Sequence, residues 1–411
     1  MRVCVIGAGA AGLSAAKQAL DCENVKKLAV FEQTDKVGGT WVYTDRTGKD
    51  EFGLPIHSSM YKNMRTNLPK EVMPFFGDPF PEDLPSFISH NDVQKYLENY
   101  ALKYNIVKHI KFRHQIVSVD PKKDDLWTVK FKNILTNKYN FEEFEIVFVC
   151  NGHYFKPEVP PLEGMDEFKG RIVHSHEYRE PGPFHGQRVV CLGAGPSGMD
   201  ISLELAEVCE KLLDTPLPDN LEQKPSIDRF NKTGVVLSTG EEVPVDAVVF
   251  CTGYAYSFPF LNGEKLPLTV SAGLVSPLYQ HFIHIERKGL FFIGLNQTFL
   301  PFSCFEIQAR CALAVMSGEG KLPSKKEMYE WEEKDYKLKR DKLGTSKAHY
   351  LSDLQWAYRE ELARLGNFPD PTRKVTERLY RETSDSRKTN LPGYKDINYR
   401  LMDDENFERV P

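Results

Sequence analysis

The sequence lacks the features that mark several large classes of protein. It contains no run of about 18 apolar residues, so no membrane span is expected. The first apolar run begins at Arg2 with no signal-type segment before it. This predicts a soluble protein that is cytoplasmic, or secreted if a signal peptide was removed ahead of residue 1. Basic residues are scattered and the formal net charge is −5, so nucleic acid is not an expected partner.

Cysteine is sparse and is not arranged in pairs. None of the eight cysteines belongs to a C-x-x-C motif, which argues against a redox-active disulfide and against a metal site. Cys4, Cys150, Cys191 and Cys251 lie in short apolar runs, where a reduced thiol packs as a small hydrophobic group. The sequence offers no convincing catalytic triad and no histidine–cysteine cluster, so neither a metal nor a protein nucleophile is predicted.

The chain does contain two similar units of the α/β type. With 411 residues, of which 41% are hydrophobic, it is long enough for two or three domains. An apolar run at 2–6 stops at Gly7, an amphipathic stretch follows at 10–21, and a second apolar run at 28–31 ends at Glu32. This pattern predicts a strand–helix–strand unit with parallel strands. Residues 188–209 repeat the apolar run, the glycine and the amphipathic stretch.

The first unit carries the G-x-G-x-x-G pattern of a dinucleotide site. Its glycines permit a tight turn, a close approach of pyrophosphate to the backbone and close packing of the helix, whose N-terminus attracts phosphate. Glu32 stands where an acid accepts hydrogen bonds from ribose hydroxyls, and a second glycine pair at 38–39 favours FAD over NAD. The residues predicted to bind this cofactor are Gly7, Gly9, Ala10, Ala11, Gly12, Glu32, Gly39, Thr40 and Trp41.

The second unit has the same pattern and implies a second dinucleotide. FAD is commonly paired with a nicotinamide cofactor that reduces it. The residues predicted to bind it are Gly193, Gly195, Ser197, Gly198 and Asp200.

The order of these units predicts an insertion. Further strands are expected at 115–120, 127–132 and 144–150, and prolines at 157, 160 and 161 mark a crossing between domains. We therefore predict two Rossmann-like domains, with the smaller nicotinamide domain inserted in the FAD domain. The expected boundaries are 1–157 for the first part of the FAD domain, 158–251 for the inserted domain and 252–411 for the second part of the FAD domain.

The last part of the FAD domain is expected to differ along its length. A run at 247–251 closes the inserted domain, and 289–295 returns to the first. Residues 324–365 have helical spacing. The polar tail from about Ser384 is expected to be irregular and to wrap a surface or a partner subunit, which leaves a homodimer open.

Several motifs resemble those of the flavin-containing monooxygenases, a family of class B flavoprotein monooxygenases. Residues 168–178 match the F-x-G-x-x-x-H-x-x-x-Y signature, and 250–254 match the F-A-T-G-Y linker except that Cys251 replaces alanine. Residues 61–70 resemble the asparagine-bearing segment of the family, and 289–295 and 305–310 its C-terminal flavin region. The chain is particularly similar to soluble insect members such as pyrrolizidine alkaloid N-oxygenases.

The resemblance implies FAD, NADPH and O2 as cofactors, and oxygenation of a nucleophilic nitrogen or sulfur through a C4a-hydroperoxyflavin. The implied substrate is a small amine, alkaloid or thioether. Asn67 is the predicted catalytic residue, because its amide can donate to and accept from the cofactors, and Thr66 and Leu68 are predicted to contact them. The alternative for Asn67 is a turn asparagine before Leu68 and Pro69.

Rival functions remain at this stage. Baeyer–Villiger relatives usually carry tryptophan and proline where this chain has Tyr178 and Arg179, which favours oxygenation of a heteroatom. A flavin disulfide reductase would need a cysteine pair, and an amine oxidase would lack the second glycine triplet. A non-enzymatic, nucleotide-dependent redox sensor is a further alternative. His174, within the signature, is predicted to be structural.

One departure from the family bears on the nicotinamide. The segment 211–216 lacks the serine- and arginine-bearing loop expected near the 2′-phosphate of NADP, so NADPH rather than NADH is implied only by the resemblance. Asp214 there is compatible with a free 2′-hydroxyl.

Overall fold

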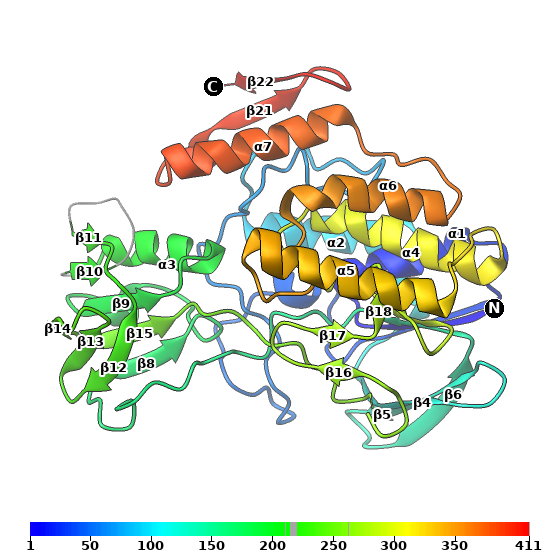
Figure 1. The fold of residues 1–411 in the computed structure, drawn as a ribbon, viewed down its shortest axis with the longest axis horizontal. Coiled ribbons are helices and arrows are strands. Elements are labelled where there is room, and N and C mark those ends of the chain that lie inside the picture. Colours follow the sequence, from blue (N-terminus) through cyan, green and yellow to red (C-terminus); the bar gives the residue numbers. More distant parts are fainter. Residues whose placement is uncertain (210, 214–219, 262, 411) are drawn as a thin grey trace.

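The protein is built on two sheets that lie side by side (Figure 1). The computed structural model describes residues 1–209, 211–213, 220–261 and 263–410. The larger sheet has the strand order β18-β19-β20-β7-β1-β2-β3, in which β20, β7, β1, β2 and β3 are parallel. Its strands are β1 (Arg2–Ile6), β2 (Lys27–Phe31), β3 (Ile110–Lys111), β7 (Ile146–Val149), β18 (Leu278–Tyr279), β19 (Ile283–His284) and β20 (Leu290–Phe292).

The two faces of this sheet are covered differently. Helices pack on one face, where their apolar residues form the largest core with those of the strands, and a three-stranded antiparallel sheet covers the other. The helices are α1 (Ala10–Asp21), α2 (His90–Lys103), α4 (Pro301–Ser317) and α6 (Gln355–Leu365); the strands are β4 (His114–Pro121), β5 (Trp127–Asn133) and β6 (Tyr139–Phe144). The strand expected at 144–150 is split, because Phe144 ends β6 and β7 begins at Ile146.

The second sheet is formed wholly by residues that lie between β7 and β20 in the chain. It is parallel, with the order β11-β10-β9-β15-β8, and α3 (Pro196–Ala206) packs on it. Its strands are β8 (Arg171–His174), β9 (Arg188–Leu192), β10 (Lys211–Leu213), β11 (Leu221–Glu222) and β15 (Ala247–Phe250), accompanied by an antiparallel group of β12 (Ile227–Asn231), β13 (Gly234–Leu237) and β14 (Glu242–Pro244). The predicted pair of Rossmann-like units, one inserted in the other, is confirmed; α3 ends three residues before the expected Cys209.

The two connections of the inserted unit run side by side. The Glu158 amide donates to the Gly253 carbonyl and the Ala255 amide to the Lys156 carbonyl, both at 3.0 Å. The proline-rich crossing expected from 157 onward therefore pairs with the return crossing. The boundaries at 157/158 and 251/252 stay predictions.

The C-terminal segment is not irregular. α5 (Lys325–Leu343) and α6 satisfy the helical expectation, and α7 (Lys374–Thr389) is followed by a hairpin of β21 (Asn398–Leu401) and β22 (Phe407–Val410). The prediction of an irregular tail from Ser384 was wrong, because Tyr394 and Tyr399 of this polar segment bury their rings against Phe87, far away in the chain. The tail does wrap the surface of its own chain (Figure 1).

The remaining elements are short. They are β16 (Thr269–Val270), β17 (Val275–Ser276) and the 3₁₀ turns η1 (Gly39–Trp41), η2 (Val107–His109), η3 (Gly182–Phe184), η4 (Ser352–Leu354) and η5 (Tyr394–Asp396). The four cysteines expected in the core are buried, and none of them forms a disulfide with another described residue. None of the helices in the described part of the chain is long and apolar enough to cross a membrane.

Candidate active site

The first glycine triplet makes a loop that only glycine can form. Gly7 follows β1 with φ of +102°, and a Cβ there would lie 2.6 Å from the Cys150 carbonyl oxygen. A Cβ on Gly12 would lie 1.8 Å from the Gly7 oxygen, so α1 packs directly on the loop. Gly9 is the N-cap of α1, which has no side-chain cap and no acid in its first turn. Ala10 and Ala11 lie in the first turn of α1. Because no side chain of the cap or the first turn neutralises the positive end of the helix dipole, this N-terminus can bind an anion.

The second glycine pair lies against the first triplet. The Gly38 amide donates to the Ala8 carbonyl at 3.0 Å, and a Cβ on Gly39 would be 2.9 Å from the Gly9 Cα. Thr40 and Trp41 follow in η1, where Trp41 packs edge-on against Phe302 of α4. Residues predicted separately at 7–12 and 39–41 are thus brought together.

Glu32 is fixed beside this loop. Its buried carboxylate accepts from the Ala8 amide and the Thr34 amide, each at 2.8 Å, and from the Thr34 hydroxyl at 2.9 Å. It lies just after the end of β2, the position that the sequence predicted. Its contact with a ribose stays a prediction.

The second triplet repeats the geometry with more room. Gly193 has φ of +120° and its Cβ would lie 2.4 Å from the Cys251 carbonyl oxygen, while a Cβ on Gly198 would be 1.8 Å from the Gly193 oxygen. A Cβ on Gly195 would meet no atom of the described residues within 4 Å. The space in front of α3 is therefore open at the position where the sequence predicts a pyrophosphate, beside Pro196 and Ser197 in the first turn.

The predicted catalytic segment holds two polar atoms without a partner. The Thr66 amide donates to the Ile88 carbonyl at 2.8 Å, but the Thr66 hydroxyl and the Asn67 Oδ1 are buried and unpaired in the described part of the chain. A buried unpaired polar group costs about 1–3 kcal/mol. The Asn67 oxygen does not accept from a neighbouring amide, as it would in an asparagine turn, so a bound cofactor fits these two atoms. Leu68 is partly buried against the cores of the first unit and the tail.

Asp200 has partners that the sequence did not suggest. Its Oδ2 accepts from the Tyr61 hydroxyl at 2.9 Å and from the Lys395 ammonium at 2.6 Å. Its predicted contact with the second cofactor stays a prediction, while its observed contacts reach toward Asn67 and the tail. Lys395 was missed because it lies in the segment expected to be irregular.

The family signature joins the two crossings. The buried His174 ring accepts the His176 amide on Nδ1 and contacts the Gly253 carbonyl through Nε2, both at 3.1 Å. Burial lowers the pKa of His174 to about 4. Both nitrogens serve the backbone, which confirms the predicted structural role.

Arg179, three residues after His176, was used above only to separate families, but its buried side chain joins several backbone segments. Its guanidinium donates to the backbone carbonyls of Thr44, Arg46, Ser58, His176 and Tyr178. It ties the segment after η1 to the signature.

The fold and these loops define an oxidoreductase of the kind that binds two dinucleotides. The profile of a family described as flavin-binding monooxygenase-like matches residues 1–216 and 217–373. The chain belongs to this family and is a flavin monooxygenase, as the motifs indicated.

Relatives agree with this assignment along almost the whole chain. Senecionine N-oxygenase of Tyria jacobaeae is 31% identical over 422 residues, which cover 99% of this chain and 91% of that protein. Flavin-containing monooxygenase FMO GS-OX5 of Arabidopsis thaliana is 38% identical over 377 residues, covering 85% and 81%. The solved structure of S-allyl-L-cysteine S-oxygenase from Allium sativum has a TM-score of 0.89 and 34% identity, covering 96% and 94%. The chain is similar to enzymes that oxygenate nitrogen or sulfur.

The segment after α3 bears on the choice between NADPH and NADH. Asp214, on which the choice between NADPH and NADH partly rested, lies outside the described residues. Residues 211–213 form β10 beside β9, the usual next strand of a Rossmann unit.

Buried histidines predict loss of stability in acid. Burial lowers the pKa of His57, His153, His174 and His284 to about 4 and that of His349 to about 3. The unfolded chain takes up these protons near pH 6.5 and the folded chain does not, so the stability present above pH 6.5 is lost as the pH falls toward 4. Each histidine is expected to lower the free energy of unfolding by about 1.4 kcal/mol per pH unit in this window. Buried Glu306, whose pKa is raised to about 7, acts in the opposite direction below pH 7.

Denaturant unfolding of the holoprotein at pH steps from 7 to 5 measures this slope. His284→Gln should reduce the slope of the free energy of unfolding against pH by about 1.4 kcal/mol per pH unit, the contribution of one histidine. His185→Gln, at an exposed position, should not change this slope. A free energy of unfolding that stays flat from pH 7 to 5 would contradict the prediction.

Proposed function

We propose that FAD binds at the first glycine triplet, NADPH binds at the second, and Asn67 serves the oxygenating step between them. The observation that carries this assignment is the buried Asn67 Oδ1, which has no partner among the described residues. It lies beside the Thr66 hydroxyl in a segment bonded to both units. Cofactor groups would supply the missing partners.

Each residue set has a defined task in this proposal. The amides at the starts of α1 and α3 hold the two pyrophosphates, and Glu32 accepts hydrogen bonds from a ribose. When bound, FAD supplies electron transfer from the nicotinamide and the reaction with O2. Asn67 orients the cofactors by hydrogen bonds. The surrounding buried segments exclude water, which would otherwise allow side reactions. This chemistry uses no nucleophile or metal of the protein.

The proposed substrates are small molecules with a nucleophilic nitrogen or sulfur, such as amines, alkaloids and thioethers. Relatives named for N-oxygenation of senecionine and S-oxygenation of S-allyl-L-cysteine support both atoms. The purified protein should be yellow and, with NADPH in air, should convert a tertiary amine or a thioether to its oxide. Conversion of a ketone to an ester would instead indicate a Baeyer–Villiger enzyme. A protein that binds both cofactors without substrate-dependent oxygen uptake would indicate a sensor. Parallel assays with NADH test the preference for NADPH.

Asn67→Leu is expected to uncouple the reaction. FAD should stay bound, because the glycine loops that hold it lie elsewhere, but a hydrogen bond lost at a buried site costs about 1–3 kcal/mol, or roughly ten- to a hundredfold in rate. NADPH should still be consumed, and hydrogen peroxide should replace oxygenated product. The measurement is the ratio of peroxide to product per NADPH.

Asn24→Leu, the same change at an exposed turn near the N-terminus, is the control and should leave the ratio unchanged. A normal product yield in Asn67→Leu would mean that Asn67 only shapes the turn.

A further inference from the structure

The C-terminal segment brings one ammonium group to both halves of the proposed site. Lys395 in η5 donates from Nζ to the Asp200 carboxylate at 2.6 Å and to the Arg65 carbonyl at 3.1 Å. Asp200 lies on α3, just after the second glycine triplet, and Arg65 lies two residues before Asn67. Lys395 and Asp200 side chains are only 12% and 11% exposed, so water screens their attraction little.

Arg65 makes the return contacts. Its guanidinium donates to the Lys395 carbonyl and pairs with the Asp396 carboxylate, while its Nε donates to the Phe87 carbonyl. The Tyr61 hydroxyl adds a second link from the asparagine segment to Asp200. The asparagine segment, the tail and α3 therefore meet at one polar junction.

The tail does not need Lys395 in order to dock. Tyr394 and Tyr399 pack their rings on Phe87, the Ser86 amide donates to the Asn398 side chain, and the Tyr399 amide donates to the Ser86 hydroxyl. Figure 1 shows α7 and the hairpin lying along one edge of the molecule, from above α3 to above α6. The tail therefore packs on the first unit independently of Lys395, and the Lys395 side chain extends from it to contact Asp200 of the second unit.

We propose that Lys395 is a positioning residue that couples the Asn67 segment to α3 and so holds the two cofactor loops in register. The inference rests on the proposed function, because it gives the second triplet to the nicotinamide. Without the ammonium group, α3 and the asparagine segment would lose their shared partner, and the nicotinamide cofactor would be bound less firmly.

The test compares Lys395→Met with Lys388→Met in the full-length holoprotein. Lys388 is an exposed lysine of α7 whose ion-pair partner among the described residues is Asp385, so it controls for loss of a tail charge. Lys395→Met should keep its FAD and the slow hydrogen exchange of the hairpin 398–410. It should weaken equilibrium binding of NADP+, raise the hydrogen exchange of 61–70, and raise peroxide formation, each by about tenfold, the scale of one lost hydrogen bond to a charged group. Lys395→Arg should recover part of each effect.

A double-mutant cycle with Asp200→Asn makes the result specific. If the two groups act together, the double variant should bind NADP+ no more weakly than Lys395→Met alone. Unchanged NADP+ binding and exchange at 61–70 in Lys395→Met would overturn the proposal, as would faster exchange confined to the hairpin. If the wild type does not bind NADP+ at all, the proposed function fails. The coupling is then decided by exchange at 61–70 alone, which must rise in Lys395→Met and not in Lys388→Met.

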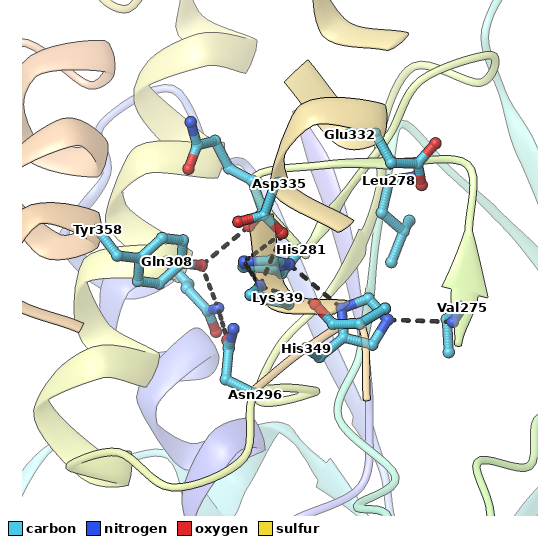
Figure 2. A network of polar contacts seen from close by, with 12 residues as sticks. Val275, Leu278, His281, Asn296, Gln308, Glu332, Asp335, Lys339, His349 and Tyr358 are labelled. Atoms are coloured by element: carbon cyan, nitrogen blue, oxygen red, sulfur yellow. Dashed lines mark hydrogen bonds and ion pairs between the residues drawn. The ribbon is translucent and has the colours of Figure 1, made fainter. Parts of the chain in front are cut away.

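An independent observation concerns a buried polar network around Lys339 of α5 (Figure 2). The Lys339 nitrogen, fully buried, contacts the Asp335 carboxylate and the Ala348 carbonyl, each at 2.7 Å, and the His281 Nε2 at 3.0 Å. His281 Nδ1 faces His349 Nδ1 at 3.3 Å, and His349 Nε2 accepts the Val275 amide at 3.0 Å. The network borders a cavity of about 520 Å³.

The hydrogen atoms of this chain of contacts can be counted. Because His349 Nε2 accepts from Val275, a neutral His349 carries its proton on Nδ1 and donates to His281. His281 then carries its own proton on Nε2, which points at Lys339. An ammonium has three donors and no acceptor, so two N–H groups would oppose each other at 3.0 Å. A neutral amine has two donors for Asp335 and Ala348 and one lone pair for His281.

We infer that Lys339 is an uncharged amine in the folded protein. Among the described residues, Asp335 is the carboxylate that contacts it. The imidazoles of His281 and His349 approach from the other side, and the Tyr358 hydroxyl beside His281 donates to the Gln280 carbonyl. The unfolded lysine is protonated below about pH 10.5, so unfolding takes up a proton and the unfolding constant should fall tenfold for each unit of rising pH.

Unfolding of the wild type and of Lys339→Met between pH 7.5 and 9.5 tests this inference. In the wild type and in an exposed control, Lys334→Met, the unfolding constant should fall tenfold more for each pH unit than it does in Lys339→Met. If Lys339→Met does not fold, proton uptake during unfolding of the wild type and of Lys334→Met in weak buffer replaces it. One proton from Lys339 beyond those of the other groups supports the neutral amine. Equal slopes in all three proteins, or no such uptake, would overturn it.

Discussion

Gly195→Val is expected to give a yellow protein whose flavin NADPH no longer reduces. Gly195 has an extended backbone with φ of −77°, and its Cβ would meet no described atom within 4 Å, so valine strains neither the loop nor α3. The isopropyl group would occupy the space in front of α3 where the nicotinamide pyrophosphate is proposed to lie. The rate of flavin reduction at a fixed, ordinary NADPH concentration should fall at least about a hundredfold, since displacing a bound reactant by about 1 Å has that effect.

Anaerobic mixing with NADPH, followed by the flavin absorbance, measures this rate. Gly182→Val is the matched control, because Gly182 is exposed, has no positive φ and also has no atom within 4 Å of its Cβ. Gly198→Ala is the contrasting variant: its Cβ would lie 1.8 Å from the Gly193 oxygen, so it should disrupt the fold of the second unit itself. Normal reduction in Gly195→Val would show that the two loops have been assigned in the wrong order.

Gly9→Val is expected to give a folded but colourless protein. Gly9 also has an extended backbone, and its Cβ would lie 3.4 Å from the Gly39 Cα, an ordinary contact. The larger side chain would stand between the α1 N-terminus and the proposed pyrophosphate of FAD. A loss of about 2.7 kcal/mol or more of binding free energy corresponds to a hundredfold weaker affinity.

The flavin content of the purified variant, before and after incubation with excess FAD, is the measurement. Circular dichroism shows whether the apoprotein is folded, and Gly182→Val should retain its flavin. A full flavin spectrum in Gly9→Val would remove FAD from the first triplet.

The sequence was most informative where local geometry dictates the residue. Any side chain would collide with a backbone oxygen at Gly7, Gly12, Gly193 and Gly198. Glycine at these positions therefore identifies the turn directly from the sequence. Strands buried on both faces read as continuous apolar runs, which is why β1, β2, β9 and β15 were found close to their true bounds.

The structure of polar segments was harder to predict from the sequence. The tail has too few apolar residues to show a period, and its structure depends on Tyr394 and Tyr399 meeting Phe87, more than 300 residues earlier in the chain. Arg179 shows the same limit, since its five acceptors in the described part of the chain are backbone carbonyls, which have no signature in the sequence.

By itself, the sequence determined the two glycine loops, the insertion of one unit in the other and the family, because glycine spacing and apolar runs are local consequences of backbone sterics and burial. Only the tertiary structure decided that Glu32 accepts from the Ala8 amide, that the Asn67 oxygen is buried with no partner in the described part of the chain, and that Lys395 joins Asp200 to the Arg65 carbonyl. These are contacts between polar groups distant in the chain, and their strength depends on the burial that the whole fold provides.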